Sequence, residues 1–287
     1  MTRRYHGDIV TVYRPQQRLG GLLSTAILAA RDIFRSRHLI WKLFERDFKA
    51  QFRQKILGYL WAALTPLLAI ASFVILNLTG VLNPGDTGVP YPIYVFVGTG
   101  IWSFLTTTMT SVSDGLLKQS DLILRTNIPK IALAVSSLAQ IIYNLLVHLI
   151  LLMFLLFLFG TEIHPASLLY VVLILPMILL GVTIGLVLSV VGAIARDLIS
   201  IAQSGLAFLM YLTPVVYVAK SLDSSLIQTL IWYNPLSYLI EVPRAVLLNG
   251  SGEVWVGYWL SSGLVIVLLF IAIRCFYVVQ DLVAERL

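Results

Sequence analysis

Charged residues are scarce in this chain of 287 residues, because Asp, Glu, Lys and Arg together make up only 12% of it. A typical soluble domain has about 25% charged and about 45–50% apolar residues, whereas 59% of this chain is hydrophobic. A water-soluble globule of this size cannot bury so much apolar surface. The composition therefore excludes a soluble protein and predicts an all-α membrane protein.

The sequence also lacks the residues that several kinds of functional site need. The single cysteine, Cys275, excludes an internal disulfide, and the four histidines (His6, His38, His148 and His164) share no metal-ligand spacing. No Gly-Lys dipeptide occurs, so the chain cannot form the G-x-x-x-x-G-K-[ST] loop that cradles nucleotide phosphates. No catalytic constellation is readable. We expect a protein that is not an enzyme and has no cofactor of its own, with any ATP and Mg bound by a partner subunit.

Six charge-free runs are each long enough to cross a membrane, which takes about 20 apolar residues for about 30 Å of hydrocarbon. The runs cover residues 56–85, 87–113, 131–161, 163–195, 198–219 and 254–273. They predict six transmembrane helices at about residues 57–78, 92–113, 132–159, 167–193, 199–219 and 256–276. The predicted transmembrane domain covers residues 38–280, between a basic N-terminal segment at residues 1–37 and a tail at residues 281–287.

Basic residues are distributed unevenly around these predicted spans. Twelve of the 20 Lys and Arg residues precede the first span, and only Lys220 and Arg244 fall on the outer side when the loops are alternated. Cytosolic loops carry the excess of Lys and Arg, so both the N- and C-termini are predicted to be cytosolic. The positive charge then suits anionic lipid and a cytosolic partner, not nucleic acid.

The segment between the fifth and sixth predicted spans has an interruption. Residues 224–240 are charge-free but contain Asn234 and Pro235, and proline disfavours helix at its own position and at the preceding residue. Each half is too short to span, so we predict a re-entrant helical hairpin on the outer side. Such backbone is stable at membrane depth only where protein or water surrounds it. The alternative is a seventh span, which would place the C-terminus outside.

An amphipathic segment precedes the first predicted span. At about 100° per residue its aromatic and aliphatic residues fall within about 120°, and its basic residues within about 60° on the opposite side. We predict a helix that lies in the membrane interface; the alternative is a basic stop before the span. The apolar face holds Ile40, Trp41, Phe44, Phe48 and Phe52, and the basic face holds Lys42, Arg46, Lys49 and Arg53.

Two features inside the predicted spans allow more than one interpretation. Gly181, Gly185, Ser189 and Ala193 recur every four residues, a spacing that lets another helix approach closely. That helix belongs either to a second copy or to the same subunit. His148 lies deep in the third predicted span, where a proton relay is one interpretation and a helix–helix hydrogen bond is the favoured one.

The loop after the second predicted span is a candidate docking element. Residues 114–130 mix charged and apolar residues and end near Pro129. This pattern predicts a short amphipathic helix beneath the membrane, which suits docking to a cytosolic partner. The alternative is an ordinary connecting loop.

Four stretches resemble one known family in their order and spacing: residues 46–61 with Pro66, residues 121–130, Arg196-Asp197, and residues 214–217 with 234–236 and Arg244. The chain resembles the membrane (permease) subunits of type-2 ABC exporters, and among them the permeases that export O-antigen and capsule polysaccharides. The resemblance covers most of the chain, from about residue 46 to residue 244. The segment before the amphipathic helix is longer than is usual in that family.

The resemblance implies a homodimer bound to two copies of an ABC ATPase subunit in the bacterial cytoplasmic (inner) membrane. The loop after the second span would dock in a cleft of the ATPase, with Lys118, Asp121, Arg125, Lys130, Arg196 and Asp197 at that interface. The interface helix would include Trp41, Phe44, Arg46, Phe48, Lys49, Phe52 and Arg53. The re-entrant hairpin would shape the outer exit through Trp232, Tyr233, Asn234, Pro235 and Arg244.

The expected function is that of the transmembrane subunit of an ATP-driven exporter. Its substrate would be a polysaccharide or lipid-linked glycan, such as an O-antigen, a capsule or a teichoic-acid-like polymer. One alternative is a type-2 exporter of a small hydrophobic drug or lipid. A second is an ion-coupled carrier or a membrane scaffold, but none of the six runs contains the Asp or Glu residues that ion-coupled carriers usually place at mid-membrane.

Overall fold

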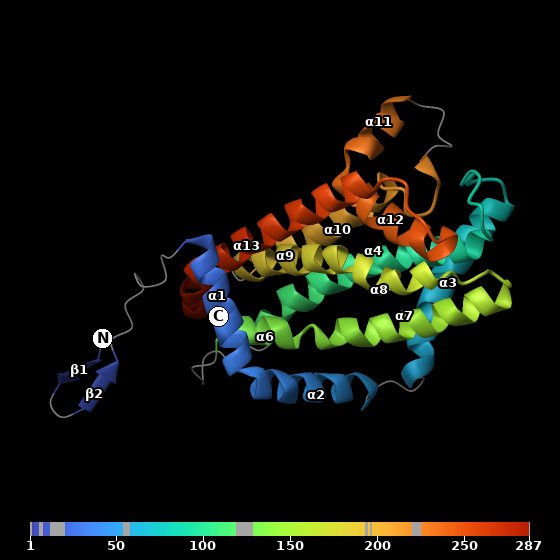
Figure 1. Ribbon diagram of the computed structural model, residues 1–287. Helices are drawn as coiled ribbons and strands as arrows, with labels where there is room; N and C mark the ends of the chain where they lie inside the picture. Colours follow the sequence, from blue (N-terminus) through green and yellow to red (C-terminus); the bar gives the residue numbers. More distant parts are fainter. Residues whose placement is uncertain are drawn as a thin grey trace.

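The protein is described by a computed structural model that covers residues 2–5, 8–11, 21–53, 58–118, 129–192, 195, 197–219 and 225–286 (Figure 1). Regular structure in this part of the chain is helical, apart from one short N-terminal hairpin. The elements are β1 (Thr2–Tyr5), β2 (Asp8–Thr11), α1 (Leu22–Arg35), α2 (Arg37–Arg53), α3 (Gly58–Leu78), α4 (Tyr91–Lys118), α6 (Lys130–Ser136), α7 (Ala139–Leu158), the 3-10 helix η2 (Pro165–Leu169), α8 (Tyr170–Leu173), α9 (Leu175–Val191), α10 (Asp197–Tyr211), α11 (Ser225–Tyr233), α12 (Pro235–Asn249) and α13 (Trp255–Arg286).

Four described helical stretches are long and apolar enough to cross a membrane, which makes this an integral membrane protein. They are Tyr91–Gly115, Lys130–Leu158, Pro165–Val191 and Trp255–Val279. They coincide with four of the six predicted spans. The stretches Leu64–Leu78 and Asp197–Tyr211 are apolar but shorter, so the six-span count stays a prediction.

Helix α4 is the centre of the bundle, and 67% of its most apolar stretch is buried, against 28% to 39% for the other three. It contacts α9, α7, α12, α3, α10 and α6. Figure 1 shows α4, α7, α9 and α13 running side by side, with α2 along the side of α7. The core is built from the N-terminal half of α4, where Ile93, Val95, Val97 and Ile101 are fully buried.

Glycines allow α4 and α9 to approach closely. A β-carbon added at Gly181 would lie 2.7 Å from the carbonyl oxygen of Leu105, and one at Gly185 would lie 2.8 Å from that of Met109. The partner of the predicted small-residue ridge is thus α4 of the same subunit, so the second-copy interpretation is wrong for these two glycines. Ala193 lies outside the described residues.

The fifth predicted span, 199–219, is helical only as far as Tyr211. Residues 212–219 form turns and bends instead. Pro214 explains this end, because proline has no N–H to donate and disfavours helix at the residue before it. The break brings an irregular segment to the end of the bundle at which α4 begins.

Two N-terminal elements were not predicted from the sequence: the hairpin β1–β2 and the helix α1. The β1–β2 hairpin makes the chain not wholly α-helical. Helix α1 packs against α13 and α6, and the Tyr277 hydroxyl of α13 donates a hydrogen bond of 2.8 Å to Oδ2 of Asp32. Helix α1 therefore lies at the same end of the bundle as the C-terminal half of α13 (Figure 1).

Candidate functional site

Helix α2 carries its predicted aromatic residues in one row. The rings of Trp41 and Phe44 stack with centroids 5.3 Å apart, and those of Phe44 and Phe48 with centroids 6.0 Å apart. Phe48 meets Tyr143 of α7 edge-on at 5.9 Å, whereas Trp41 is 62% exposed. One end of the row therefore packs against α7, and the indole at the other end is exposed. That α2 lies in the membrane interface stays a prediction.

Ion pairs line the polar side of α2. Lys49 lies 2.6 Å and Lys42 3.4 Å from the carboxylate of Glu45, and Arg46 lies 2.8 Å from that of Asp47. The hydrogen bonds from Lys49 and then Lys42 lower the pKa of the Glu45 carboxyl below its ordinary value. Exposed pairs of this kind add little to stability. Their effect is to keep a charged face apart from the aromatic row.

The side chains of two more predicted α2 residues, Phe52 and Arg53, lie outside the described part of the chain. The same holds for Asp121, Arg125 and Arg196 of the predicted ATPase interface.

Three other predicted ATPase-interface residues mark helix ends in the structure. Lys118 is the last residue of α4, Lys130 the first of α6 and Asp197 the first of α10. These helix ends lie at the end of the bundle that also holds α1 (Figure 1). Three of the six predicted residues thus belong to helix ends at the same end of the bundle. Whether they contact an ATPase subunit stays a prediction.

At the opposite end of the bundle, the irregular segment after α10 is held by side chains from two helices. Three successive carbonyl oxygens of this segment accept hydrogen bonds from α4 and α12. The three bonds run from Nη1 of Arg244 to Val215 (3.0 Å), from Oη of Tyr91 to Val216 (3.0 Å) and from Oη of Tyr94 to Tyr217 (3.1 Å). We call these three donors with their three acceptors the carbonyl clamp. Backbone without helical hydrogen bonds is costly at membrane depth unless protein supplies partners, and the carbonyl clamp supplies them.

Arg244 is the most constrained member of the carbonyl clamp. It is 3% exposed, and no other Lys, Arg, Asp or Glu among the described residues is buried. Its guanidinium carbon lies 3.9 Å from the centroid of the Tyr94 ring, a cation–π contact. A β-carbon at Gly98 would overlap the Val215 carbonyl oxygen. Helix α4 therefore contributes both a ring and a bare backbone surface to this site.

The predicted helix break at Asn234-Pro235 is confirmed, because α11 ends at Tyr233 and α12 begins at Pro235. Asn234 caps α12 by accepting a hydrogen bond of 3.0 Å from the backbone N–H of Leu236. Its side-chain amide also donates to Oγ1 of Thr213 at 3.0 Å. The break is thereby tied to the segment that the carbonyl clamp holds, whereas Tyr233 is 84% exposed.

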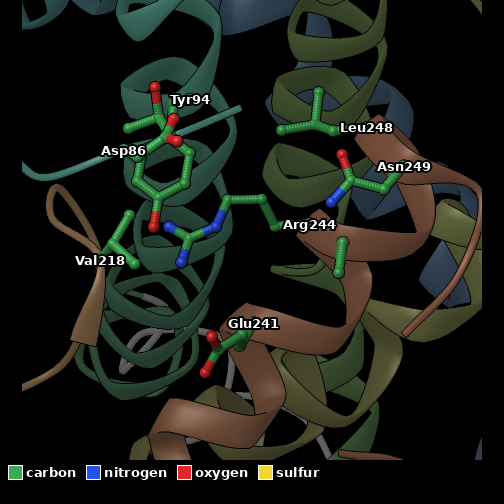
Figure 2. Close-up of a pocket in the computed structure, with 9 residues that line it drawn as sticks. Asp86, Tyr94, Val218, Glu241, Arg244, Leu248 and Asn249 are labelled. Carbon is green, nitrogen blue, oxygen red and sulfur yellow. The ribbon is translucent and has the colours of Figure 1, made fainter. Parts of the chain in front are cut away.

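A cavity of about 160 Å³ lies beside the carbonyl clamp. Its lining comes from the loop before α4, from α4, from α12 and from Val218. Figure 2 shows the Arg244 guanidinium extended towards the Tyr94 hydroxyl. Glu241 lies three residues before Arg244 in α12. Asp86 and Asn249 also line the cavity and are exposed, so the cavity opens to the surface of the bundle.

His148 of α7 is buried in an aromatic cluster. Its ring stacks on Phe96 with centroids 4.5 Å apart and meets Phe104 edge-on at 5.2 Å. Its Nε2 lies 3.0 Å from the hydroxyl of Tyr170, and a β-carbon at Gly100 would overlap the imidazole. The favoured prediction of a hydrogen bond between helices is confirmed, since α7 and α8 share this bond.

Replacing Tyr170 with phenylalanine is expected to lower the stability of the protein by about 1 kcal/mol, the usual value of an interhelical hydrogen bond in a membrane. The substitution removes the hydroxyl and leaves a buried ring nitrogen of His148 without its partner. The thermal unfolding midpoint of the purified protein in detergent measures the effect. Tyr233→Phe is the matched control, because Tyr233 is 84% exposed. Equal midpoints for both variants would contradict the assignment.

The sequence predicted Arg244 and the Asn234-Pro235 break as part of one region, but it missed the two tyrosines. Tyr91 and Tyr94 stand at the first turn of a span, where aromatic residues also form interface belts. Their spacing of three residues places both on one side of α4, which is the only local signal that they act together. Asp86 and Glu241 allowed two interpretations, solvated loop charges or groups that flank a polar substrate path, and the fold brings both to one cavity.

Known proteins are similar to this chain over most of its length. The ABC-2 type transporter family matches residues 38–248. The O-antigen export system permease protein RfbA of Myxococcus xanthus is 25% identical over 221 residues, which are 77% of this chain and 84% of the relative. Two O-antigen export system permease proteins RfbA of Klebsiella pneumoniae are 24% and 23% identical, and each match covers 74% of this chain and 81% of the relative.

The matched region begins in α2 and ends in α12, so it contains the carbonyl clamp and the Asn234-Pro235 break and leaves out α1. The resemblance to exporter permeases that the sequence motifs indicated is therefore confirmed. The chain is an integral membrane protein, and it belongs to the ABC-2 type transporter family of membrane transport components.

Proposed function

We propose that this protein is the transmembrane subunit of an ATP-driven exporter that moves a polysaccharide or lipid-linked glycan out of the bacterial cytoplasm. The observation that carries the proposal is the match, over about three quarters of the chain, to relatives described as O-antigen export system permeases. ATP is hydrolysed by a separate ABC ATPase subunit that binds from the cytosol. The absence of a Gly-Lys dipeptide supports this division, since no phosphate-binding loop of the usual form can be built without one.

In the proposed assembly, two copies of this subunit span the inner membrane with two ATPase subunits beneath them. Six spans place both termini in the cytosol, which the distribution of basic residues supports. The packing of α1 on the C-terminal half of α13 also supports it, because it puts the two ends of the chain on one side.

The second copy covers the side of the bundle that holds α10 and α11. Phe208 and Tyr211 of α10 are 67% and 63% exposed in the single subunit. Aromatic rings offer apolar faces and can stack, and this suits a path for sugar rings as well as contact with lipid. The re-entrant hairpin of α11 and α12 then borders the outer exit of a channel between the two copies.

The proposed function predicts a specific defect in cells that lack the chain. The glycan should accumulate inside the cytoplasmic membrane and disappear from the cell surface. Surface labelling with a glycan-specific antibody, compared with total glycan from lysed cells, measures the two pools. Unchanged surface glycan would contradict the proposal, and loss of drug resistance with normal surface glycan would favour export of a small hydrophobic compound instead.

Reversing the charges of the proposed coupling segment, as Asp121→Lys with Arg125→Glu, is expected to abolish export while the protein still folds. The reversed charges would face groups of the same sign on the ATPase, and like-charge contacts prevent docking. Export is measured by surface glycan, and binding by co-purification with the ATPase subunit. The triple variant Lys42→Glu, Glu45→Lys and Lys49→Glu is a control that reverses both ion pairs of Glu45 on α2 and is expected to keep binding. Normal export by the first variant would rule out this segment as the coupling element.

A further inference from the structure

The cavity beside the carbonyl clamp contains a buried cation with spare hydrogen-bond donors. Arg244 uses one N–H on the Val215 carbonyl and presents its face to the Tyr94 ring. A guanidinium has five N–H donors, and no ion pair of Arg244 is formed within the part of the chain that the structure describes. Its remaining donors are not among the buried side-chain atoms that lack a partner. Arg244 also lines the cavity, which brings these donors within reach of a ligand bound there.

The other polar groups that line the cavity with Arg244 are hydrogen-bond acceptors or mixed groups. Asp86 and Glu241 contribute carboxylates, and Asn249 contributes an amide that both donates and accepts. One Asp86 oxygen accepts a hydrogen bond from the Gly88 backbone N–H at 3.0 Å, which fixes that carboxylate at the edge of the cavity. The lining thus offers fixed donors and fixed acceptors within one small space.

This mixture of charges selects the chemistry of a ligand. An anion would meet the Asp86 carboxylate and a cation would meet the Arg244 guanidinium, so like-charge contacts count against both. A neutral polyol avoids these contacts, because each hydroxyl group donates one hydrogen bond and accepts others. It can donate to Asp86 while it accepts from Arg244 and Asn249.

The size of the cavity limits the ligand further. Pockets for drug-sized ligands measure about 300–1,000 Å³, whereas this cavity measures about 160 Å³. It accommodates one small ring at a time, and because it is open to the surface the rest of a longer saccharide can extend outside it. Its apolar lining, from Val218 and Leu248, suits the C–H surface that a sugar ring also presents.

We infer that this cavity is a binding site for a single neutral sugar unit on the outer side of the exporter. The inference rests on the proposed function, because the sugar it would meet there is part of the exported glycan. A site beside the carbonyl clamp would hold the glycan at the point where the re-entrant hairpin meets α4. It would bind a ring that has emerged and so oppose its return.

The test is saturation-transfer difference NMR with free monosaccharides and the purified full-length protein in lipid nanodiscs. The probes are glucose, galactose, mannose and rhamnose, each at millimolar concentration. At least one sugar should give a signal from its ring protons. Inorganic phosphate and calcium chloride, added separately, should not displace it. If no sugar gives a signal, or if phosphate or calcium displaces the one that does, the inference is wrong.

Two variants locate the signal without altering the carbonyl clamp. Asn249→Leu removes an amide from the lining, and Ala245→Phe fills the cavity, since both residues line it. Each should weaken sugar binding about tenfold, the effect of losing one or two hydrogen bonds. Asn83→Leu is the matched control, because Asn83 is exposed in the same outer loop as Asp86 but does not line the cavity. Binding that survives both cavity variants would overturn the site.

Export by wild-type cells separates this inference from the proposed function. Normal surface glycan together with no sugar binding overturns the site alone. Absence of any effect on surface glycan when the chain is deleted overturns the proposed function and the site with it.

Discussion

Replacing Arg244 with methionine is expected to abolish export and to destabilise the protein by about 2 kcal/mol. Methionine has a similar length but no donor, so the buried Val215 carbonyl loses its hydrogen bond, and a buried acceptor without a partner costs about 1–3 kcal/mol. The cation–π contact with Tyr94 is lost as well, while removal of a buried charge offsets part of the cost. The larger effect falls on export, because the segment that the carbonyl clamp positions is no longer held to α12.

Arg244→Lys distinguishes the charge of this side chain from its shape. Lysine keeps the charge but has no planar group to lie over Tyr94 while it donates to Val215, so intermediate export is expected. Surface glycan measures export, and thermal unfolding in detergent measures stability. Arg31→Met is the control, since Arg31 is exposed on α1 and its replacement should leave the unfolding midpoint unchanged. Wild-type export by Arg244→Met would show that the carbonyl clamp is dispensable.

Replacing Gly185 with alanine is expected to destabilise the bundle by about 1–3 kcal/mol, the usual cost of overpacking a core. The added β-carbon would lie 2.7 Å from Cβ of Val112 and 2.8 Å from the Met109 carbonyl oxygen. Helices α4 and α9 would have to separate, and α4 is the helix that carries Tyr91 and Tyr94. Gly185→Leu, with three more carbon atoms at the same place, should prevent accumulation of folded protein.

Gly263 provides the matched control for this substitution. It lies within α13, and an added β-carbon would meet nothing within 4 Å. Alanine in a helix is more stable than glycine by about 0.5–1 kcal/mol, so Gly263→Ala should be neutral or slightly stabilising. Unfolding midpoints for the two alanine variants are compared under identical conditions. A similar midpoint for Gly185→Ala and wild type would mean that the two helices do not approach as closely as described.

Hydropathy predicted four of the spans well, because charge-free runs of more than 20 residues have few alternatives to a membrane helix. The helix break at Asn234-Pro235 was equally predictable, since proline acts locally. The end of α10 at Tyr211 was not, because residues 212–219 are as apolar as the helix before them. The predicted span therefore continued to residue 219, whereas the helix ends at Tyr211, three residues before Pro214.

The candidate site depended on contacts between residues far apart in the sequence. Arg244 was placed in the exit region only by the resemblance, because its acceptor lies 29 positions away and its aromatic partner is on another helix. The small-residue ridge shows the same limit, because its spacing indicated a close helix contact without saying which helix. Helix α1 was missed because Arg31 and Asp32 interrupt its apolar residues. The structure gives Asp32 a partner on another helix, since its carboxylate accepts a hydrogen bond from Tyr277 of α13.

The central claim is that this chain forms a glycan pathway whose power comes from another subunit, and reconstitution into liposomes tests it most directly. The purified protein is incorporated with or without its ATPase subunit, the lipid-linked glycan is supplied, and both ATP hydrolysis and delivery of glycan across the bilayer are measured. We expect delivery only when both subunits and ATP are present, and no ATP hydrolysis by this chain alone. ATP hydrolysis by the isolated chain, or delivery driven by an ion gradient without the ATPase, would contradict the account.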